Sequence, residues 1–318
     1  MPVVAILWMI LATSNGAAPA KTDVTPASPA TYRKTELEGL IGNLYRAREK
    51  SEAWLQYSPD SYLAAIQRVS FKTRAALTVG SDADNDVQIL GPGVEPHHLR
   101  VSMQADSFRV VAVDDSARFE CLGEDVRDTA MGPGTITIGR DSRYTIRLSH
   151  QNAPAIIVFD TKSPHFKDFR GRKYFAFDGA YRFLLPLTQA ATPDTVRIAS
   201  TQGTPRLALR MGWFDFLIGK THCRLAAYHL LEPGIPDGDL AVFFRDATNG
   251  KETWPDGRLL SAPWLHRGNR YVLDFNLAEN PACAISRYHN CPLPPKENTL
   301  KIPILAGEKD MHYIVAKR

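Results

Sequence analysis

Apolar side chains recur at helical spacing between residues 32 and 55. They share one face of a helix, with charged residues on the other face: Leu37, Leu40, Ile41, Leu44 and Tyr45. The pattern predicts an amphipathic helix within residues 21–57. We expect its apolar stripe to pack on the body of the protein rather than on a membrane surface.

Beyond Pro59 the periodicity changes to that of β structure. Short β-branched and aromatic runs alternate with Gly, Pro, Asn and Asp as far as the C-terminus. The chain is therefore predicted to be mainly β. The C-terminal strand candidates form an antiparallel series that a barrel or a sandwich would protect from open edges: residues 195–200, 206–219, 224–231, 240–247 and 270–276.

One group of β motifs follows a distinctive order. The runs ALTVGSDADNDVQI, EPHHLRV, SFRVVAV, GPGTITIG and RYTIRL succeed one another from residue 76 to residue 148. This order resembles a forkhead-associated-like β-sandwich, a family whose members bind phosphothreonine peptides through an Arg, a Ser and an Asn. Here Ser81, Glu95 and Leu122 take those places. Because a carboxylate repels a phosphate dianion, the resemblance implies the sandwich shape without phosphothreonine-peptide binding.

These patterns divide the chain into four parts. They are an export segment (1–20), a linker with the amphipathic helix (21–57), the forkhead-associated-like β-sandwich (58–150) and a C-terminal β domain (155–318). The run SHQNAP at 149–154 marks the boundary between the two β parts.

The N-terminal segment has the character of a signal peptide. Residues 3–12 are apolar but too few to span a bilayer, and APA at 18–20 fits a cleavage site that leaves Lys21 first. We expect a periplasmic or secreted protein with no stable membrane anchor after cleavage. No Lys or Arg precedes the apolar run, so a buried N-terminal helix is the alternative.

Composition narrows the class of partner. The 318 residues are 44% hydrophobic and 23% charged, which is ordinary for a soluble globular protein. The formal net charge is only +4, and the Lys and Arg residues are scattered along the chain. Nucleic acid is therefore not an expected partner; a small molecule or an envelope protein is.

Polar residues gather in the C-terminal half, where strands run into charge. In LAVFFRDATNGKETWPDGR and YVLDFN, strand alternation puts Asp274 and Asn276 on the face opposite Leu273 and Phe275. They either cap turns facing solvent or line one ligand site. The candidate ligand-binding residues are Arg245, Asp246, Glu252, Arg258, Asp274, Asn276, Asn280, Glu297 and Asn298.

Histidines and cysteines offer little support for a metal site. His97 and His98 are adjacent, so one is expected to be packed and the other solvated. Cys283 and Cys291, with His289 between them, are too far apart for a C-x-x-C zinc knuckle. In an exported protein a disulfide between them is the simplest reading, with free thiols as the alternative. For Cys121 and Cys223 two alternatives stay open, a disulfide between them or two buried free thiols. No metal and no cofactor are predicted.

Several C-terminal segments resemble a known family. FRDATNGKETWPDGRLL, LDFNLAENPACAI, CPLPPKENTLKIPILAGEK and HFKDFRGRKYFAFDGAYRF look like the signature of a bacterial domain of unknown function, family 1684. The resemblance implies no established activity.

Two function classes remain open. The first is an exported cell-envelope protein, without catalytic activity, that binds a small polar or anionic ligand or a partner protein. The second is a hydrolase, for example of the glycosidase type, that uses Glu252, Asp274 or Glu297 as a carboxylate pair. No serine-nucleophile elbow, metalloprotease helix or phosphate loop is present in the sequence.

Overall fold

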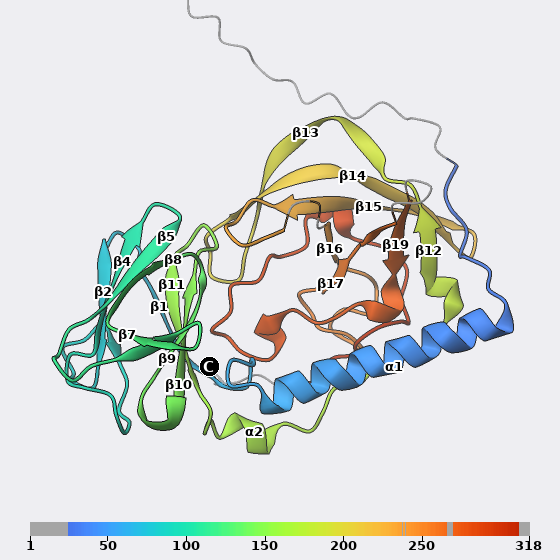
Figure 1. Ribbon diagram of the computed structural model, residues 1–318. Coiled ribbons are helices and arrows are strands. Elements are labelled where there is room, and N and C mark those ends of the chain that lie inside the picture. The colour runs from blue at the N-terminus through green and yellow to red at the C-terminus, as the bar shows by residue number, and fades with distance from the viewer. Residues whose placement is uncertain (1–24, 237, 239, 266–269, 312–318) are drawn as a thin grey trace, which may run out of the picture.

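The computed structural model describes residues 25–236, 238, 240–265 and 270–311, and it is mainly β as predicted (Figure 1). One group of sheets, from the first half of the chain, stands beside a second group from the second half, and helix α1 runs beneath the second group. The predicted signal peptide at 1–20 lies outside the described residues.

Helix α1 (Lys34–Tyr57) confirms the predicted amphipathic helix. Glu36 accepts the backbone N–H of Arg33, which satisfies a free donor at the helix start. Leu44 and Leu55 are buried, whereas Tyr45 of the predicted stripe is 56% exposed. In the described part of the chain, no helix combines the length and apolarity needed to span a bilayer.

The first half of the chain forms a two-sheet sandwich. Its six-stranded sheet has the order β1 (Ala65–Ser70), β11 (Ala155–Asp160), β10 (Tyr144–Ser149), β9 (Gly134–Ile138), β6 (Phe119–Cys121), β7 (Glu124–Val126). Its five-stranded sheet has the order β3 (Val87–Gln88), β2 (Ala76–Gly80), β4 (Leu99–Gln104), β5 (Ser107–Ala112), β8 (Asp128–Met131). Alternating apolar residues from both sheets make one core. The likeness to forkhead-associated domains stays a prediction.

The sandwich extends past the predicted boundary at 150–155. Strand β11 pairs with both β1 and β10, so residues 155–160 belong to the first β unit. The run SHQNAP turns the chain between β10 and β11, with Ser149 opposite Ala155. Turn residues have the same composition in a hairpin and in a linker, which explains the difference.

The second half forms two further sheets around a shared core. One is β13 (Thr188–Ile198), β14 (Arg206–Ile218), β15 (Thr221–Leu230), β16 (Ala241–Phe244), β17 (Arg258–Ser261). The other is β12 (Arg182–Leu185), β19 (Arg270–Asp274), β18 (Trp264–Leu265). Phe183 on β12 and Phe216 on β14 lie 5.0 Å apart between ring centroids, so the two sheets share apolar contacts. The predicted strands are present, but β13 begins at Thr188 rather than at residue 195, and β19 lies in the smaller sheet instead of continuing the series of the other four.

Short helical turns complete the described chain. They are α2 (His165–Asp168), η1 (Arg140–Ser142), η2 (Gly179–Tyr181), η3 (Phe275–Leu277), η4 (Ala282–Ala284) and η5 (Lys296–Asn298).

The segment after η4 joins the two β units. Arg68 on β1 donates to the carbonyl of Tyr288 at 3.3 Å. The ring of His289 packs edge-on against Tyr62, with centroids 4.8 Å apart. The sandwich is thereby attached to the C-terminal unit through both polar and aromatic contacts.

Asn298 fills a gap between β15 and β16. The described contacts between these strands pair only Tyr228 with Ala241. Asn298 is fully buried, and its amide accepts the N–H of Ala226 and donates to the carbonyls of Ala226 and Phe243, at 2.7, 2.9 and 2.8 Å. The side chain thus replaces the missing strand-to-strand hydrogen bonds.

Replacing Asn298 by Ala should lower the free energy of unfolding by about 3 kcal/mol, because buried backbone groups lose their partners. Chemical denaturation measures this change. The control Asn43→Ala, on the exposed side of α1, should alter stability by less than about 0.5 kcal/mol. Equal effects of the two substitutions would contradict the bridging role.

Candidate functional site

A cavity of about 550 Å³ opens between α1 and the segment that precedes β12. Its lining combines two guanidinium groups, two carboxylates and three aromatic rings: Tyr45, Arg48, Glu49, Glu52, Arg172, Tyr174, Phe175 and Ala176. The volume falls in the range of small-molecule sites. From the sequence, Tyr45 was named only as part of the apolar stripe of the helix, and residues 172–176 were covered only by the family resemblance of 165–183.

Arg172, which lines this cavity, is paired with the buried carboxylate of Glu308 behind the lining. Their side chains are 5% and 1% exposed, and Arg172 Nε lies 3.7 Å from Glu308 Oε1. That separation is an ion pair without a hydrogen bond, so both atoms lack a hydrogen-bond partner in the structure. The other oxygen, Oε2, accepts the backbone N–H of Asn280 at 3.0 Å.

Burial dominates the electrostatics of the pair. It raises the pKa of Glu308 to about 7, although Arg172 and the Asn280 N–H act against the shift. Burial also disfavours the charge of Arg172, but Glu308 and Tyr174 outweigh it and leave the pKa of Arg172 above its usual value. A carboxyl group that titrates near neutrality therefore sits beside a permanent cation.

Arg48 brings a second guanidinium to the same place. Its guanidinium lies 4.2 Å from the centroid of the Tyr174 ring, and Tyr174 also interacts with Arg172 and raises the pKa of that guanidinium. Arg48 also donates to the carbonyls of Phe175 and Asn276, at 3.4 and 3.1 Å. Its Nε is buried without a partner. Tyr174 thus interacts with both guanidinium groups.

A glycine precedes each member of the buried pair. Gly171 has φ of 83°, and a Cβ there would lie 2.7 Å from Glu52 Oε1. Gly307 has φ of 82°, and a Cβ there would lie 2.7 Å from the carbonyl oxygens of Phe275 and Ala278. Only glycine fits both the conformation and the space, so these two positions deliver Arg172 and Glu308 to each other.

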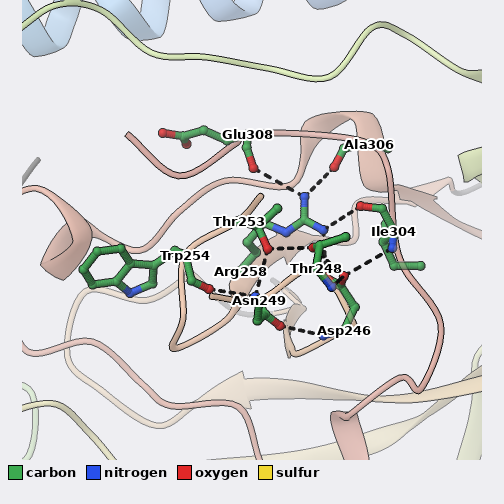
Figure 2. A network of polar contacts seen from close by, with 9 residues as sticks. All are labelled: Asp246, Thr248, Asn249, Thr253, Trp254, Arg258, Ile304, Ala306 and Glu308. Carbon is green, nitrogen blue, oxygen red and sulfur yellow. Dashed lines mark hydrogen bonds and ion pairs between the residues drawn. The ribbon is translucent and has the colours of Figure 1, made fainter. Parts of the chain in front are cut away.

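The predicted residues Asp246 and Arg258 form a separate, sealed network (Figure 2). Arg258 Nη2 donates to Asp246 Oδ2 at 2.8 Å, and both side chains are 0% exposed. Arg258 also donates to the carbonyls of Ile304, Ala306 and Glu308. The guanidinium therefore holds the backbone of residues 304–308 in place.

The rest of this network shapes a turn. Asp246 Oδ1 accepts from the backbone and hydroxyl of Thr248 and from the N–H of Ile304. Asn249 donates to Thr253 Oγ1 and to the Trp254 carbonyl (Figure 2). Because the oxygens of Asp246 are all engaged and sealed from solvent, these residues support the fold rather than face a ligand.

The remaining predicted residues do not join one site. Asp274 and Asn276 are buried, not directed outward: Asp274 caps η3 by accepting the N–H of Asn276, and burial raises the pKa of Asp274. Asn276 donates to the carbonyl of Asp178. Asn298 bridges β15 and β16, as described above. Asn280 contacts the buried pair through its N–H, which donates to the Glu308 carboxylate, whereas Arg258 reaches only the Glu308 backbone carbonyl.

The three carboxylates of the hydrolase alternative are each occupied elsewhere or exposed. Glu297 accepts from Tyr228 at 2.8 Å and pairs with Arg210 at 3.5 Å, and Asp274 lies 3.6 Å from Arg182. Glu252 is exposed, and Arg245 pairs with Asp256 at 3.7 Å. Two of the three carboxylates, Glu297 and Asp274, are therefore each paired with an arginine, and no described contact joins any two of the three.

Comparison with known protein families gives a match in the C-terminal unit. Residues 167–309 match the family described as protein of unknown function (DUF1684). Through this segment the chain belongs to the DUF1684 family. An uncharacterised protein of Haloarcula marismortui with a solution NMR structure is 33% identical, over 45% of this chain and 78% of that chain, with a TM-score of 0.38. No curated protein matches the chain.

The DUF1684 segment supplies half of the residues that line the cavity. Arg172, Tyr174 and Glu308 lie within the matched residues, as does the network of Arg258 that positions Glu308. Arg48 and Glu52 come from α1, outside the matched residues. The cavity thus lies between the DUF1684 segment and helix α1, which is outside the matched residues.

Cys283 and Cys291 of the DUF1684 segment are neighbours but are not bonded. Both are buried free thiols, and Cys291 Sγ accepts the backbone N–H of Cys283 at 3.2 Å. A hydrogen bond from the Cys283 thiol lowers the pKa of Cys291 and raises that of Cys283. The predicted disulfide is therefore not formed in this structure, although its two partners are in contact. Cys121 and Cys223 lie in different cores.

The histidine pair is arranged as expected. His98 is 2% exposed and hydrogen-bonds the carbonyl of Arg118, while His97 is solvated. His97 lies 3.7 Å from Asp84 and 4.0 Å from Asp82, close enough for the three to share a metal ion, which sequence spacing did not reveal. A mixed-charge cleft of about 570 Å³ also opens at this sandwich. Its Arg118 already donates to backbone carbonyls.

Replacing Arg258 by Leu should cost about 3 to 5 kcal/mol of stability, because Asp246 is left buried and unpaired. Replacing Arg245, whose pair with Asp256 is partly exposed, by Leu should lower the free energy of unfolding by less than about 1 kcal/mol. Denaturant titration of both variants tests the contrast. A Arg258→Leu protein as stable as wild type would show that the network is dispensable.

Oxidation of the reduced protein with diamide should remove two of the four thiols and link Cys283 to Cys291, the only pair whose contact the described residues show. Alkylation, peptide mapping and mass spectrometry identify the bond. Cys121 and Cys223 should remain alkylatable after unfolding. A link that involves either of them would contradict this assignment.

Proposed function

We propose that this protein is a non-catalytic binding protein of the cell envelope that holds a small anionic molecule in the cavity between α1 and residues 172–176. The observation that carries the proposal is the pair of guanidinium groups, Arg48 and Arg172, whose Nε–H donors are buried without hydrogen-bond partners beside a cavity of about 550 Å³. Buried donors of this kind favour an anionic oxygen, because they gain a charge-assisted hydrogen bond.

The two arginines are arranged for one ligand. Tyr174 interacts with both, since its ring lies against the Arg48 guanidinium and it raises the pKa of Arg172. Ser51 on α1 accepts from Arg172 Nη1 at 2.9 Å, which fixes the guanidinium further. A planar group held on several sides loses little conformational entropy on binding, so a carboxylate, sulfate or phosphate group fits this end of the cavity.

The outer part of the cavity narrows the ligand further. Glu49 and Glu52 line it together with the rings of Tyr45 and Phe175. These carboxylates repel a ligand that is anionic throughout and accept hydrogen bonds from hydroxyl or amino groups. The favoured ligand has one anionic group for the arginines and donor groups toward the rim.

Sulfate tests the anionic subsite directly, at pH 6.5 and constant ionic strength maintained with chloride. Sulfate should raise the unfolding temperature of the wild-type protein in a saturable way. Arg48→Gln and Arg172→Gln should each weaken the apparent affinity by at least about tenfold, since each removes a charged donor. Arg100→Gln, an exposed arginine on β4, serves as the matched control and should bind as wild type does.

Two results would contradict the proposal. One is the absence of a saturable response to sulfate in the wild-type protein. The other is a response that Arg100→Gln weakens as much as Arg48→Gln does, which would indicate general salt effects. Arg48 pairs with no carboxylate in the described contacts, so its substitution leaves no buried charge behind and keeps the test interpretable if Arg172→Gln folds poorly.

A further inference from the structure

Glu308 is a buried carboxyl group that pairs with Arg172, one of the two arginines that line the proposed anion site. Its carboxyl group is fully buried and lies 3.7 Å from Arg172 Nε, on the guanidinium that the proposed ligand would use. An ionised Glu308 would compete with the ligand for that positive charge. A protonated Glu308 would not, and the full charge of Arg172 would then be available.

The charged and polar groups around Glu308 determine whether its carboxyl group is protonated. Arg172 and Tyr174 approach from the segment before β12, and Glu279 and Asn280 from the segment after η3. Arg258 on β17 donates to the Glu308 backbone carbonyl, and Arg48 on α1 contributes a more distant charge.

Two features keep the Glu308 carboxylate poorly stabilised. Only Oε2 accepts a hydrogen bond, from Asn280, and Oε1 has no hydrogen-bond partner. Burial raises the pKa of Glu308 to about 7, and burial also raises the pKa of Tyr174, so this phenol stays neutral in the same range. Glu308 is the group beside Arg172 that exchanges a proton near neutrality.

We propose that anion binding at Arg172 is coupled to proton uptake by Glu308, so that the cavity binds its ligand together with one proton from solvent. This inference rests on the proposed function. The balance is simple: the Glu308 carboxylate, one solvent proton and the anion give a neutral Glu308 and a bound anion. The only covalent bond that forms is the O–H bond of Glu308.

The sign of the pH dependence follows from this balance. The form that binds the anion well is protonated, so affinity is greatest and nearly constant below the pKa of Glu308. Above about pH 7, affinity falls by up to about tenfold for each pH unit, because one proton must be taken up for each anion bound. The bound anion reciprocally favours the protonated carboxyl group.

Calorimetric titration of the full chain with sulfate measures both quantities. Sulfate keeps its charge between pH 5.5 and 8.5, so the protein alone determines the pH dependence. We expect the dissociation constant to change by less than about threefold from pH 5.5 to 6.5 and by about tenfold from pH 7.5 to 8.5. Buffers of different ionisation enthalpy should report uptake of nearly one proton for each sulfate at pH 8.5.

Matched variants assign the proton to Glu308. Glu308→Gln keeps the shape of the side chain without its charge, so it should bind sulfate with one affinity from pH 6.5 to 8.5 and more tightly than wild type at pH 8.5. Glu38→Gln, an exposed carboxylate on α1, is the control and should retain the wild-type pH dependence. If Glu308→Gln does not fold, the proton uptake of the wild-type protein still decides the question.

The outcomes separate this inference from the proposed function. Sulfate binding with equal affinity from pH 6.5 to 8.5 and without proton uptake would overturn the coupling and leave the anion site intact. A Glu308→Gln variant that keeps the wild-type pH dependence would also overturn it. Absence of sulfate binding throughout, including at pH 5.5, would instead remove the proposed function, and the coupling with it.

Discussion

The guanidinium of Arg258 is the constraint on which the C-terminal unit depends. It is sealed from solvent, paired with Asp246 and bonded to the backbone carbonyls of residues 304, 306 and 308. In a regular sheet, the N–H groups of a neighbouring strand would donate hydrogen bonds to these carbonyls. Here a single side chain does so in an irregular segment, and the position of Glu308 beside Arg172 follows from it.

The two buried arginine–carboxylate pairs, Arg258–Asp246 and Arg172–Glu308, consist of similar residues but have different roles. Asp246 shares its oxygens among Arg258, Thr248 and the Ile304 N–H, and so its charge is fully compensated. Glu308 keeps one oxygen without a hydrogen bond. The Nε–H groups of Arg172 and Arg258 both lack a partner, but of the two arginines only Arg172 lines the cavity of about 550 Å³. Full compensation stabilises a fold, whereas incomplete compensation beside a cavity leaves interaction free energy for a ligand or a proton.

The periodic parts of the fold were predictable from the sequence. Helix α1 and strands β14, β15 and β19 follow their hydrophobic patterns closely. The site was not, because its residues follow no periodicity: Arg172 and Glu308 sit in loops at opposite ends of the family segment. The signal they do carry is a charged residue directly after glycine, in FRGRKY and LAGEK.

Other predictions differ from the structure for identifiable reasons. Alternation along β19 separated Asp274 from Leu273 correctly, but η3 begins at once after Asp274, so its carboxylate turns inward to cap that turn. Asp246 and Arg258 were predicted to bind a ligand, but the structure pairs them with each other in a sealed network. Their mutual pairing, which makes them structural, depends on the chain returning at residues 304–308, and no local pattern encodes that return.

The most direct test of this account is a crystal structure of the protein grown with selenate at pH 6, recorded with anomalous scattering from selenium. The account predicts an anomalous peak in the cavity within hydrogen-bonding distance of the Arg48 and Arg172 guanidinium groups, with Glu308 still beside Arg172. Selenate found only at the molecular surface, with both guanidinium groups turned away from the cavity, would contradict it.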